Sequence, residues 1–469
     1  MKGATVPDAV QPLSPEWWLH RLYGQLVDRR DEVEFFNDYY SGNHPLPWLA
    51  PQARDEFRRL VRMTRSNYMG LVVDATAERL QVEGFRFGGD QSADTDTWRI
   101  WQANNLDSDS DMAWLEALIA RFSYFHVAPN PKDPETPHIW VEHPSQVIVE
   151  HEPGTNRRVR KAGLKVYNDD WTQEIHAVLQ VDGMLYKYRA PRPRDGVVST
   201  KLQWDEREVA GEQPNGHRKN PLGVVSMIEV PNNPRLLVGG VSELHDLTDI
   251  QDRVNKTLFD RMQTQEFGVD PQKWAKAFPD KDADGKPNVV EFGRNRMITT
   301  DVAETAFGNF AVAPLDPYNL AKREDVKDIA SRSRTPAQYL LGEMSNVNGE
   351  TLKASESGLI SKVRQRMRPF SEAAEETMRL ARIAAELPVS TGAQMETIWR
   401  DPQYRTDAER TDAALKRYQG NVVPLRQTRE DLGYSPTQIE QMEQADDQEA
   451  TRAAAAGVKA IRDAATGGN

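Results

Sequence analysis

The chain has 469 residues and a formal charge of −12 at pH 7, and 38% of its residues are hydrophobic. Its 11 Trp, 13 Tyr and 14 Phe supply large apolar surfaces, so we expect a globular protein of roughly three domain-sized units. The absence of cysteine excludes disulfides, thiolate metal sites and a cysteine nucleophile, and the acidic balance excludes nucleic-acid binding by bulk charge.

The N-terminal part is predicted to be helical. Residues 1–15 are rich in proline and poor in large apolar groups, so we expect a flexible lead without the features of a signal peptide. Apolar residues at helical spacing predict a helix from about residue 16 to 40, ended by Ser41 and Gly42, and a second helical run from Phe57 to Leu80. Two more helices are expected in DTWRIWQANNL and MAWLEALIARF. No segment has the uninterrupted apolar length that a membrane-spanning helix needs.

Alternating apolar and polar residues come next. The stretches HIWVEH, QVIVEH, GLKVY, IHAVLQ and MLYKYR are typical of short strands, and Asp182-Gly183 between the last two is a strong hairpin signal. A β-rich insert in an otherwise helical chain makes α+β the expected fold class.

The C-terminal half returns to long helices. We expect a helix capped by Ser242 and stopped by Gly268, with a narrow apolar stripe suited to packing against neighbouring helices, formed by Leu244, Leu247, Ile250, Val254, Leu258 and Met262. An irregular segment, 268–315, leads to a helix over 316–334 and then to a loop over 335–349. A very long helix with a kink at Pro369 follows, and beyond Thr397 we expect two or three short helices and an alanine-rich tail.

One motif in the irregular segment fits the calcium-loop pattern D-x-[DN]-x-[DN]-G-x5-E at every specified position. Its metal ligands would be Asp280, Asp282, Asp284 and Glu291. An EF-hand is disfavoured because Pro279 directly precedes the motif, Pro287 removes a backbone N–H, and the chain has no second loop to pair with. We therefore favour a solvated turn built on Asp284-Gly285, with a lone calcium loop as the alternative.

Other motifs give little evidence for chemistry. His138, Glu142 and His143 lack the spacing of the zinc-protease motifs, and no nucleophile elbow, phosphate loop or dinucleotide fingerprint occurs, so we expect no catalytic residue and no cofactor. One basic cluster predicts a cationic strip on a helix face, formed by Arg54, Arg58, Arg59, Arg62 and Arg65. The strip would contact DNA or an acidic partner chain, or else be a solvated face partly neutralised by neighbouring acids.

Several runs, in order along almost the entire chain, carry a family resemblance. They are YYSGNHPLPWLA, LVVDATAERLQVEGFRF, VPNNPRLLVGGVSEL, IQDRVNKTLFDRM, LGYSPTQIE and, most strongly, TPAQYLLGEMSNVNGETLKASESGLISKVRQRM. In these runs the sequence resembles the portal proteins of tailed bacteriophages, particularly those of actinobacteriophages. The resemblance implies a structural protein without catalytic activity. It would form a homo-oligomeric ring, a dodecamer, at one capsid vertex, and this ring would conduct double-stranded DNA in packaging and ejection.

The resemblance also implies how the chain is divided. Residues 16–239 and the helix 350–390 would build the wing, 240–267 and 316–334 the stem, 268–315 the clip, and 391–469 the crown and C-terminal tail. Residues 335–349 would be the tunnel loop, with side chains directed at DNA from Glu343, Met344, Ser345, Asn346 and Asn348. The implied partners are terminase, head-completion or adaptor proteins, and the major capsid and scaffolding proteins. Assembly would take place in the host cytoplasm, and the virion would be the final location.

Two alternatives stay open from the sequence. One is a calcium- or metal-dependent enzyme built on the 280–291 loop. The other is a head–tail connector ring that does not serve as the packaging vertex.

Overall fold

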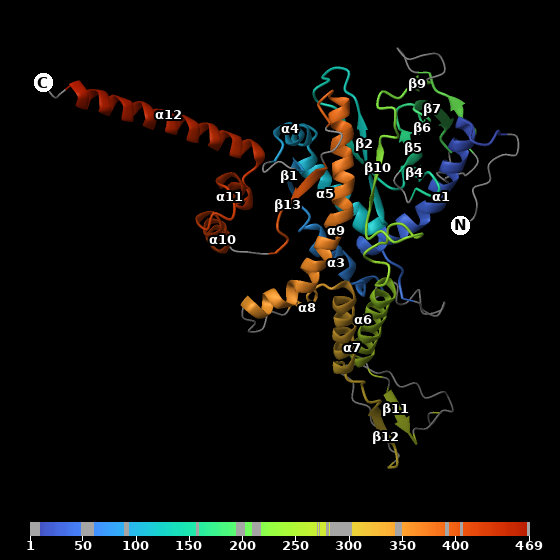
Figure 1. Cartoon of the computed structure of the whole chain (residues 1–469). Helices are drawn as coiled ribbons and strands as arrows, with labels where there is room; N and C mark the ends of the chain where they lie inside the picture. Colours follow the sequence, from blue (N-terminus) through green and yellow to red (C-terminus); the bar gives the residue numbers. More distant parts are fainter. Residues whose placement is uncertain are drawn as a thin grey trace.

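The computed structural model describes residues 10–47, 61–88, 93–155, 159–193, 202–208, 217–269, 271, 273–277, 281, 303–342, 349–389, 394–403 and 407–466. Figure 1 shows a body of mixed helices and strands, a helix pair that projects from it, and a C-terminal helical arm. The α+β class is therefore confirmed. Within the described ranges, no helix combines the length and the apolar character needed to cross a bilayer.

The first helix, α1 (Pro15–Tyr40), begins and ends where the sequence predicts. Ser14 caps it by accepting a hydrogen bond from the backbone N–H of Trp17 at 3.2 Å, and Pro15 fits the first turn. The prediction of one continuous helical run up to Leu80 is wrong. Asn67 caps a new helix, α3 (Tyr68–Ala77), and a strand, β1 (Val82–Phe87), follows it. Leu71, expected on the buried face, is 45% exposed.

The main hydrophobic core lies between helices from both halves of the chain. The two predicted helices α4 (Thr95–Ala103) and α5 (Leu106–Ala120) are confirmed, and each contributes a fully buried tryptophan, Trp101 and Trp114. Trp114 stacks on Phe370 of the long helix α9 (Gly349–Ala384), with ring centroids 5.0 Å apart. The long helix therefore completes the core that the N-terminal helices begin.

Two antiparallel sheets lie beside this core. The predicted strands β4 (Val147–His151), β5 (Arg160–Asp169), β6 (Glu174–Val181) and β7 (Met184–Pro191) pair in sequence order. The short strands β8 (Asp205–Glu206) and β9 (Arg218–Lys219) both pair with β7. The hairpin at Asp182-Gly183 is confirmed, because both residues have positive φ, as a tight two-residue turn requires. The apolar face of α1 covers this sheet (Figure 1).

The second sheet contains two strands that the sequence did not indicate. Its order is β10 (Met227–Pro231), β2 (Phe122–Ala128), β3 (His138–Glu142). The central strand β2 is buried along almost its whole length, so it has no alternation of apolar and polar residues.

The C-terminal half differs from the prediction in its boundaries. The helix α6 (Thr248–Val269) starts after Ser242, whose hydroxyl instead accepts a hydrogen bond from the Leu244 N–H in the preceding turn, and it runs past Gly268. The helix α7 (Asp316–Ser333) is confirmed, whereas residues expected to form a loop contain a short helix, α8 (Ala337–Leu341). Pro369 lies inside α9, which continues beyond it.

After α9 the chain returns to the body before it leaves again. The strand β13 (Met395–Trp399) pairs antiparallel with β1. The arm consists of α10 (Asp407–Gln419), α11 (Leu425–Asp431) and α12 (Pro436–Thr466), and α12 is much longer than the short helices that the sequence predicts. Figure 1 shows α12 extending away from the body.

Candidate functional site

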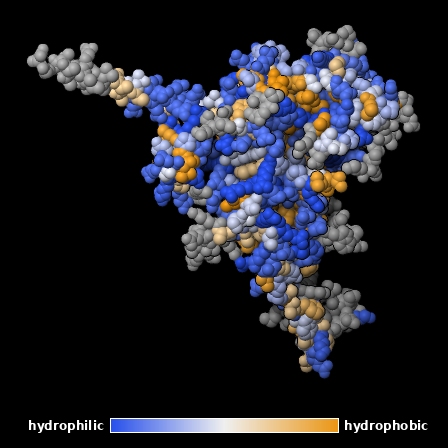
Figure 2. Space-filling view, in the orientation of Figure 1, coloured by the Kyte–Doolittle hydropathy of each residue, from blue (hydrophilic) through white to orange (hydrophobic). Residues whose placement is uncertain are grey.

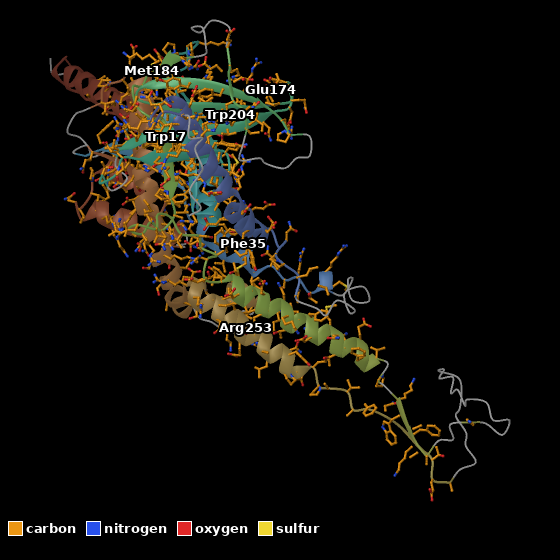
Figure 3. All side chains as sticks on the ribbon, turned by 90° about the vertical axis from the view of Figure 1, so that its right-hand side faces the viewer. Trp17, Phe35, Glu174, Met184, Trp204 and Arg253 are labelled. Atoms are coloured by element: carbon orange, nitrogen blue, oxygen red, sulfur yellow. The ribbon has the colours of Figure 1, made fainter. Side chains whose placement is uncertain are left out.

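The projecting element is an antiparallel pair made by α6 and α7 (Figures 1 and 3). Near the body, Arg253 of α6 pairs with two carboxylates of α7, Asp325 at 2.7 Å and Asp328 at 2.8 Å. Farther out, the Arg261 guanidinium donates to the side-chain oxygen of Asn319 at 3.0 Å. These contacts fix the register of the two helices along most of their length, so the pair is a defined unit.

The apolar side chains of this helix pair are buried near the body and exposed toward the tip. Leu258 of α6 and Val326 and Ile329 of α7 are buried, as the predicted apolar stripe requires. Of that stripe only Met262 is partly exposed rather than buried. Beyond it, Phe267 is 60% exposed and Leu320 is 63% exposed. Figure 2 shows separate apolar patches on the projecting part, among hydrophilic residues. A single copy of the chain therefore leaves large apolar side chains of this pair in water.

The tip carries a two-stranded ribbon where the sequence predicted an irregular segment. The strand β11 (Lys273–Lys276) pairs with β12 (Ala306–Asn309), and Trp274 lies opposite Gly308. A Cβ at Gly308 would lie 2.6 Å from the Trp274 ring, so only glycine allows the indole to cross the neighbouring strand here. Phe310 is 56% exposed beside the ribbon. The tip thus has a small, partly apolar surface.

The calcium-motif residues Asp280, Asp282, Asp284 and Glu291 lie outside the described residues. Among the residues that are described, no group of three or more His, Cys, Asp or Glu side chains is arranged to hold a metal ion. The calcium loop therefore stays a prediction from the sequence.

The predicted tunnel loop is anchored at both ends. Gln338 of α8, which precedes residues 343–348, donates to the Ser355 hydroxyl of α9, which follows them, at 2.8 Å. The Tyr339 hydroxyl of α8 donates to Glu356 of α9. Arg79 in turn donates to the Tyr339 hydroxyl at 3.1 Å. The five side chains expected to face DNA, Glu343, Met344, Ser345, Asn346 and Asn348, lie outside the described residues. The bases of the loop are therefore joined to each other and to the body.

The cationic strip is described only at its C-terminal end. Arg62 is exposed, and Arg65 is half-buried and donates to the backbone carbonyl of Asn43 at 3.3 Å. Arg54, Arg58 and Arg59 lie outside the described residues. The role of the strip in contacting DNA or a partner stays a prediction.

His138, Glu142 and His143 of the HIWVEH stretch have different surroundings. Glu142 accepts a hydrogen bond from the Lys165 ammonium, whereas the His143 ring contacts the Ser145 hydroxyl at 2.7 Å and the Glu116 carboxylate at 3.2 Å. His138 is exposed on β3. The three residues do not converge on one point.

One buried cluster of charges was missed by the sequence analysis. Glu243, in the turn before α6, meets Lys362 and Arg366 of α9, and all three side chains are at most 9% exposed. We call these three residues the junction cluster, because they join the long helix of the body to the base of the projecting pair. Residues so far apart in the sequence gave no signal in spacing or composition.

Comparison with known proteins gives consistent matches over nearly the whole chain. The sequence model of the family "Phage portal protein, SPP1 Gp6-like" matches residues 19–453. The portal protein of Mycobacterium phage D29 is 32% identical over 478 residues, covering 95% of this chain and 92% of its own length. The portal protein of Mycobacterium phage L5 is 33% identical over 471 residues, covering 95% and 91%.

Two solved structures have lower similarity. A chain from the neck of an empty GTA particle computed with C6 symmetry has a TM-score of 0.43 and 12% identity, with 84% of this chain and 96% of that chain covered. A chain from the neck of the native GTA particle computed with C12 symmetry has a TM-score of 0.43 and 13% identity, with 83% and 96% covered.

Proposed function

Because the chain belongs to the SPP1 Gp6-like family of phage portal proteins, we propose that it forms the ring at the unique vertex of a phage capsid. DNA enters through this ring during packaging and leaves through it at ejection. The ring is a dodecamer that assembles in the host cytoplasm and remains in the virion. The protein is a structural component without catalytic activity of its own, and the terminase motor supplies the ATP hydrolysis.

The exposed apolar side chains of the α6–α7 pair are the observation that carries this proposal. Leu320 is 63% exposed and lies on a different face of α7 from the buried Val326 and Ile329, so another surface is needed to cover it. In a closed ring each copy contacts two neighbours through two different surfaces, which buries such side chains in every copy.

The parts of the chain are assigned to the ring as follows. The body, residues 16–239 with α9, is the wing; α6 and α7 are the stem; and the segment 268–315 at their tip is the clip. Residues 335–349 form the tunnel loop. We place the crown in α10, α11 and α12 rather than from residue 391, because β13 pairs with β1 in the body.

The clip is the surface that docks terminase during packaging and head-completion or adaptor proteins afterwards. Its ribbon exposes Trp274, Phe307 and Phe310, and aromatic side chains of this kind are enriched in protein interfaces. The major capsid and scaffolding proteins contact the outer parts of the ring. The cationic strip ending at Arg62 and Arg65 serves as a contact for DNA or for one of these acidic partners.

The channel must let DNA slide without holding it. The tunnel-loop segment 343–348 contains no lysine or arginine, and the chain has a formal charge of −12. A wall without strong phosphate ion pairs keeps the affinity for the DNA backbone low, as a conduit requires.

Replacing Leu320 with glutamate tests the stem assignment. A carboxylate at this position would be buried without a partner in the ring, so we expect assembly to fail while the monomer stays folded. Leu13→Glu is the matched control, since Leu13 is also 63% exposed and lies outside the stem. Sedimentation velocity measures the outcome. Rings of normal size from Leu320→Glu, or equal loss of assembly in both variants, would contradict the assignment.

A further inference from the structure

The junction cluster contains more positive than negative charge. The Glu243 carboxylate accepts hydrogen bonds from the Arg366 guanidinium at 2.6 Å and from the Asn232 side-chain amide at 3.0 Å. The Lys362 ammonium lies 3.6 Å from the same carboxylate. Two enclosed cations therefore share one carboxylate.

The Lys362 ammonium lacks acceptors. It has three N–H donors and its side chain is 4% exposed, yet among the described residues no acceptor lies within 3.5 Å of it, and Glu243 at 3.6 Å is its one ion-pair partner there. Burial lowers the pKa of Lys362, and the attraction of Glu243 only partly opposes this effect. A buried cation of this kind is normally supplied with oxygen acceptors, so the site has room for a further anion.

A hollow beside the cluster carries additional cations. It has a volume of about 310 Å³ and lies between the turn before α6, the C-terminal end of α7 and the middle of α9. Arg332 lines it from the last turn of α7 and Arg334 from the residue that follows this helix, and both are exposed. Neither has a carboxylate partner in the part of the chain that the structure describes. Four cationic side chains thus surround the hollow, against the carboxylates of Glu243 and of the exposed Asp246.

Three features oppose the binding of an anion here: the C-terminal end of α7, the Glu243 carboxylate and the Asp246 carboxylate, which is exposed to water. The four cationic side chains around the hollow carry more charge than these three features together. The C-terminal end of α7 contributes about half a negative charge, which the two arginines at that end outweigh. The Glu243 carboxylate repels an anion as well, yet it is already paired with Arg366 and Asn232. The remaining field in the hollow is positive.

We propose that this hollow binds a phosphate group, either as free inorganic phosphate or as a phosphodiester of the DNA backbone. Arginine guanidinium groups bind the oxygens of a phosphate in pairs, and such charge-assisted bonds are about twice as strong as neutral ones. The hollow is many times the roughly 30 Å³ that one water molecule occupies in the liquid, so a tetrahedral oxyanion fits. The bound group links α7 to α9 and so stiffens the connection between the projecting pair and the body. The assignment of the site does not depend on the proposed portal function.

Phosphate titration of the full-length chain tests this proposal. The line width of inorganic phosphate in ³¹P NMR is followed at pH 7.5, with sodium chloride added to hold the ionic strength constant. We expect saturable binding, weakened by about tenfold or more in the double variant Arg332→Gln and Arg334→Gln, because two charge-assisted bonds are lost. Arg368→Gln is the control, since Arg368 is exposed on α9 outside this hollow, and it should bind phosphate as the unchanged chain does.

Competition with a short DNA duplex distinguishes the two sources of the phosphate group. Displacement of the bound inorganic phosphate by the duplex would assign the hollow to the DNA backbone, and undiminished phosphate binding would assign it to the free ion. Both arginines are exposed, so circular dichroism should show an unchanged fold in the double variant. Absence of saturable binding, or equal affinity in the double variant and in Arg368→Gln, would overturn the proposal.

Discussion

Replacing Glu243 with glutamine tests the junction cluster as a structural link. The change leaves Lys362 and Arg366 buried without a carboxylate, while the volume of the side chain is almost unchanged. Removing one partner of a buried ion pair costs about 3–5 kcal/mol, because the remaining charge is uncompensated. A surface pair behaves differently. Glu324 and Lys327 lie 2.7 Å apart with both side chains at least half exposed, so Glu324→Gln should cost only about 0–1 kcal/mol.

Urea unfolding followed by tryptophan fluorescence measures the difference. Trp101 and Trp114 report on the core that α9 completes, and Lys362 and Arg366 of the cluster lie on that helix. With a slope of about 3 kcal/mol per molar urea, the midpoint of Glu243→Gln should fall by about 1 M or more. Replacing Glu243, Lys362 and Arg366 together by methionine should restore most of the loss, because no unpaired charge remains. A midpoint for Glu243→Gln equal to that of Glu324→Gln would refute the reasoning.

The pH dependence of stability, compared between the unchanged chain and Glu243→Gln, is a second test of the junction cluster. Burial alone would raise the pKa of Glu243, yet the nearby Lys362 and Arg366 cations hold it below the ordinary value of 4.5. A carboxyl group with a lowered pKa in the folded state stabilises the protein fully above its unfolded-state value and loses this effect as the pH falls through its folded-state value. The stability difference between the unchanged chain and Glu243→Gln should therefore shrink below about pH 4.5.

Three further changes follow from the core, from a close backbone approach and from the tunnel loop. Phe370→Ala removes the stack on the fully buried Trp114 and should cost about 3–5 kcal/mol in urea unfolding; a loss below about 1 kcal/mol would contradict this packing. Gly240→Ala would place a Cβ against the Arg121 carbonyl, so the melting temperature should fall, and an unchanged value would show that the backbones do not approach each other. Deleting residues 343–348 should leave ring assembly intact but impair DNA packaging in a complementation assay; normal packaging would show that the tunnel loop is wrongly placed.

Local signals in the sequence predicted several elements well. Ser14 and Pro15 begin α1 through a cap and a first-turn proline, which act within a few residues. Asp182 and Gly183 fix the hairpin between β6 and β7 in the same way, because few other residues accept positive φ at both positions.

Non-local features could not be predicted from the sequence. The strand β2 is buried along nearly its whole length and so lacks alternation, and the pairing of β1 with β13 joins segments from opposite halves of the chain. The junction cluster depends on a turn and a helix that only the fold brings together. The exposure of Leu320 could not be predicted either, since the sequence does not show whether an apolar residue is covered by this chain, by a second copy or by water.

Single-particle electron microscopy of the purified full-length chain tests the central claim most directly. The account predicts closed dodecameric rings with a central channel, in which α6 and α7 of each copy pack against those of both neighbours and the α12 arms lie at the end opposite the clip. Rings in which the α6–α7 pair stands free of its neighbours, or a chain that stays monomeric even with its capsid and scaffolding proteins present, would contradict it.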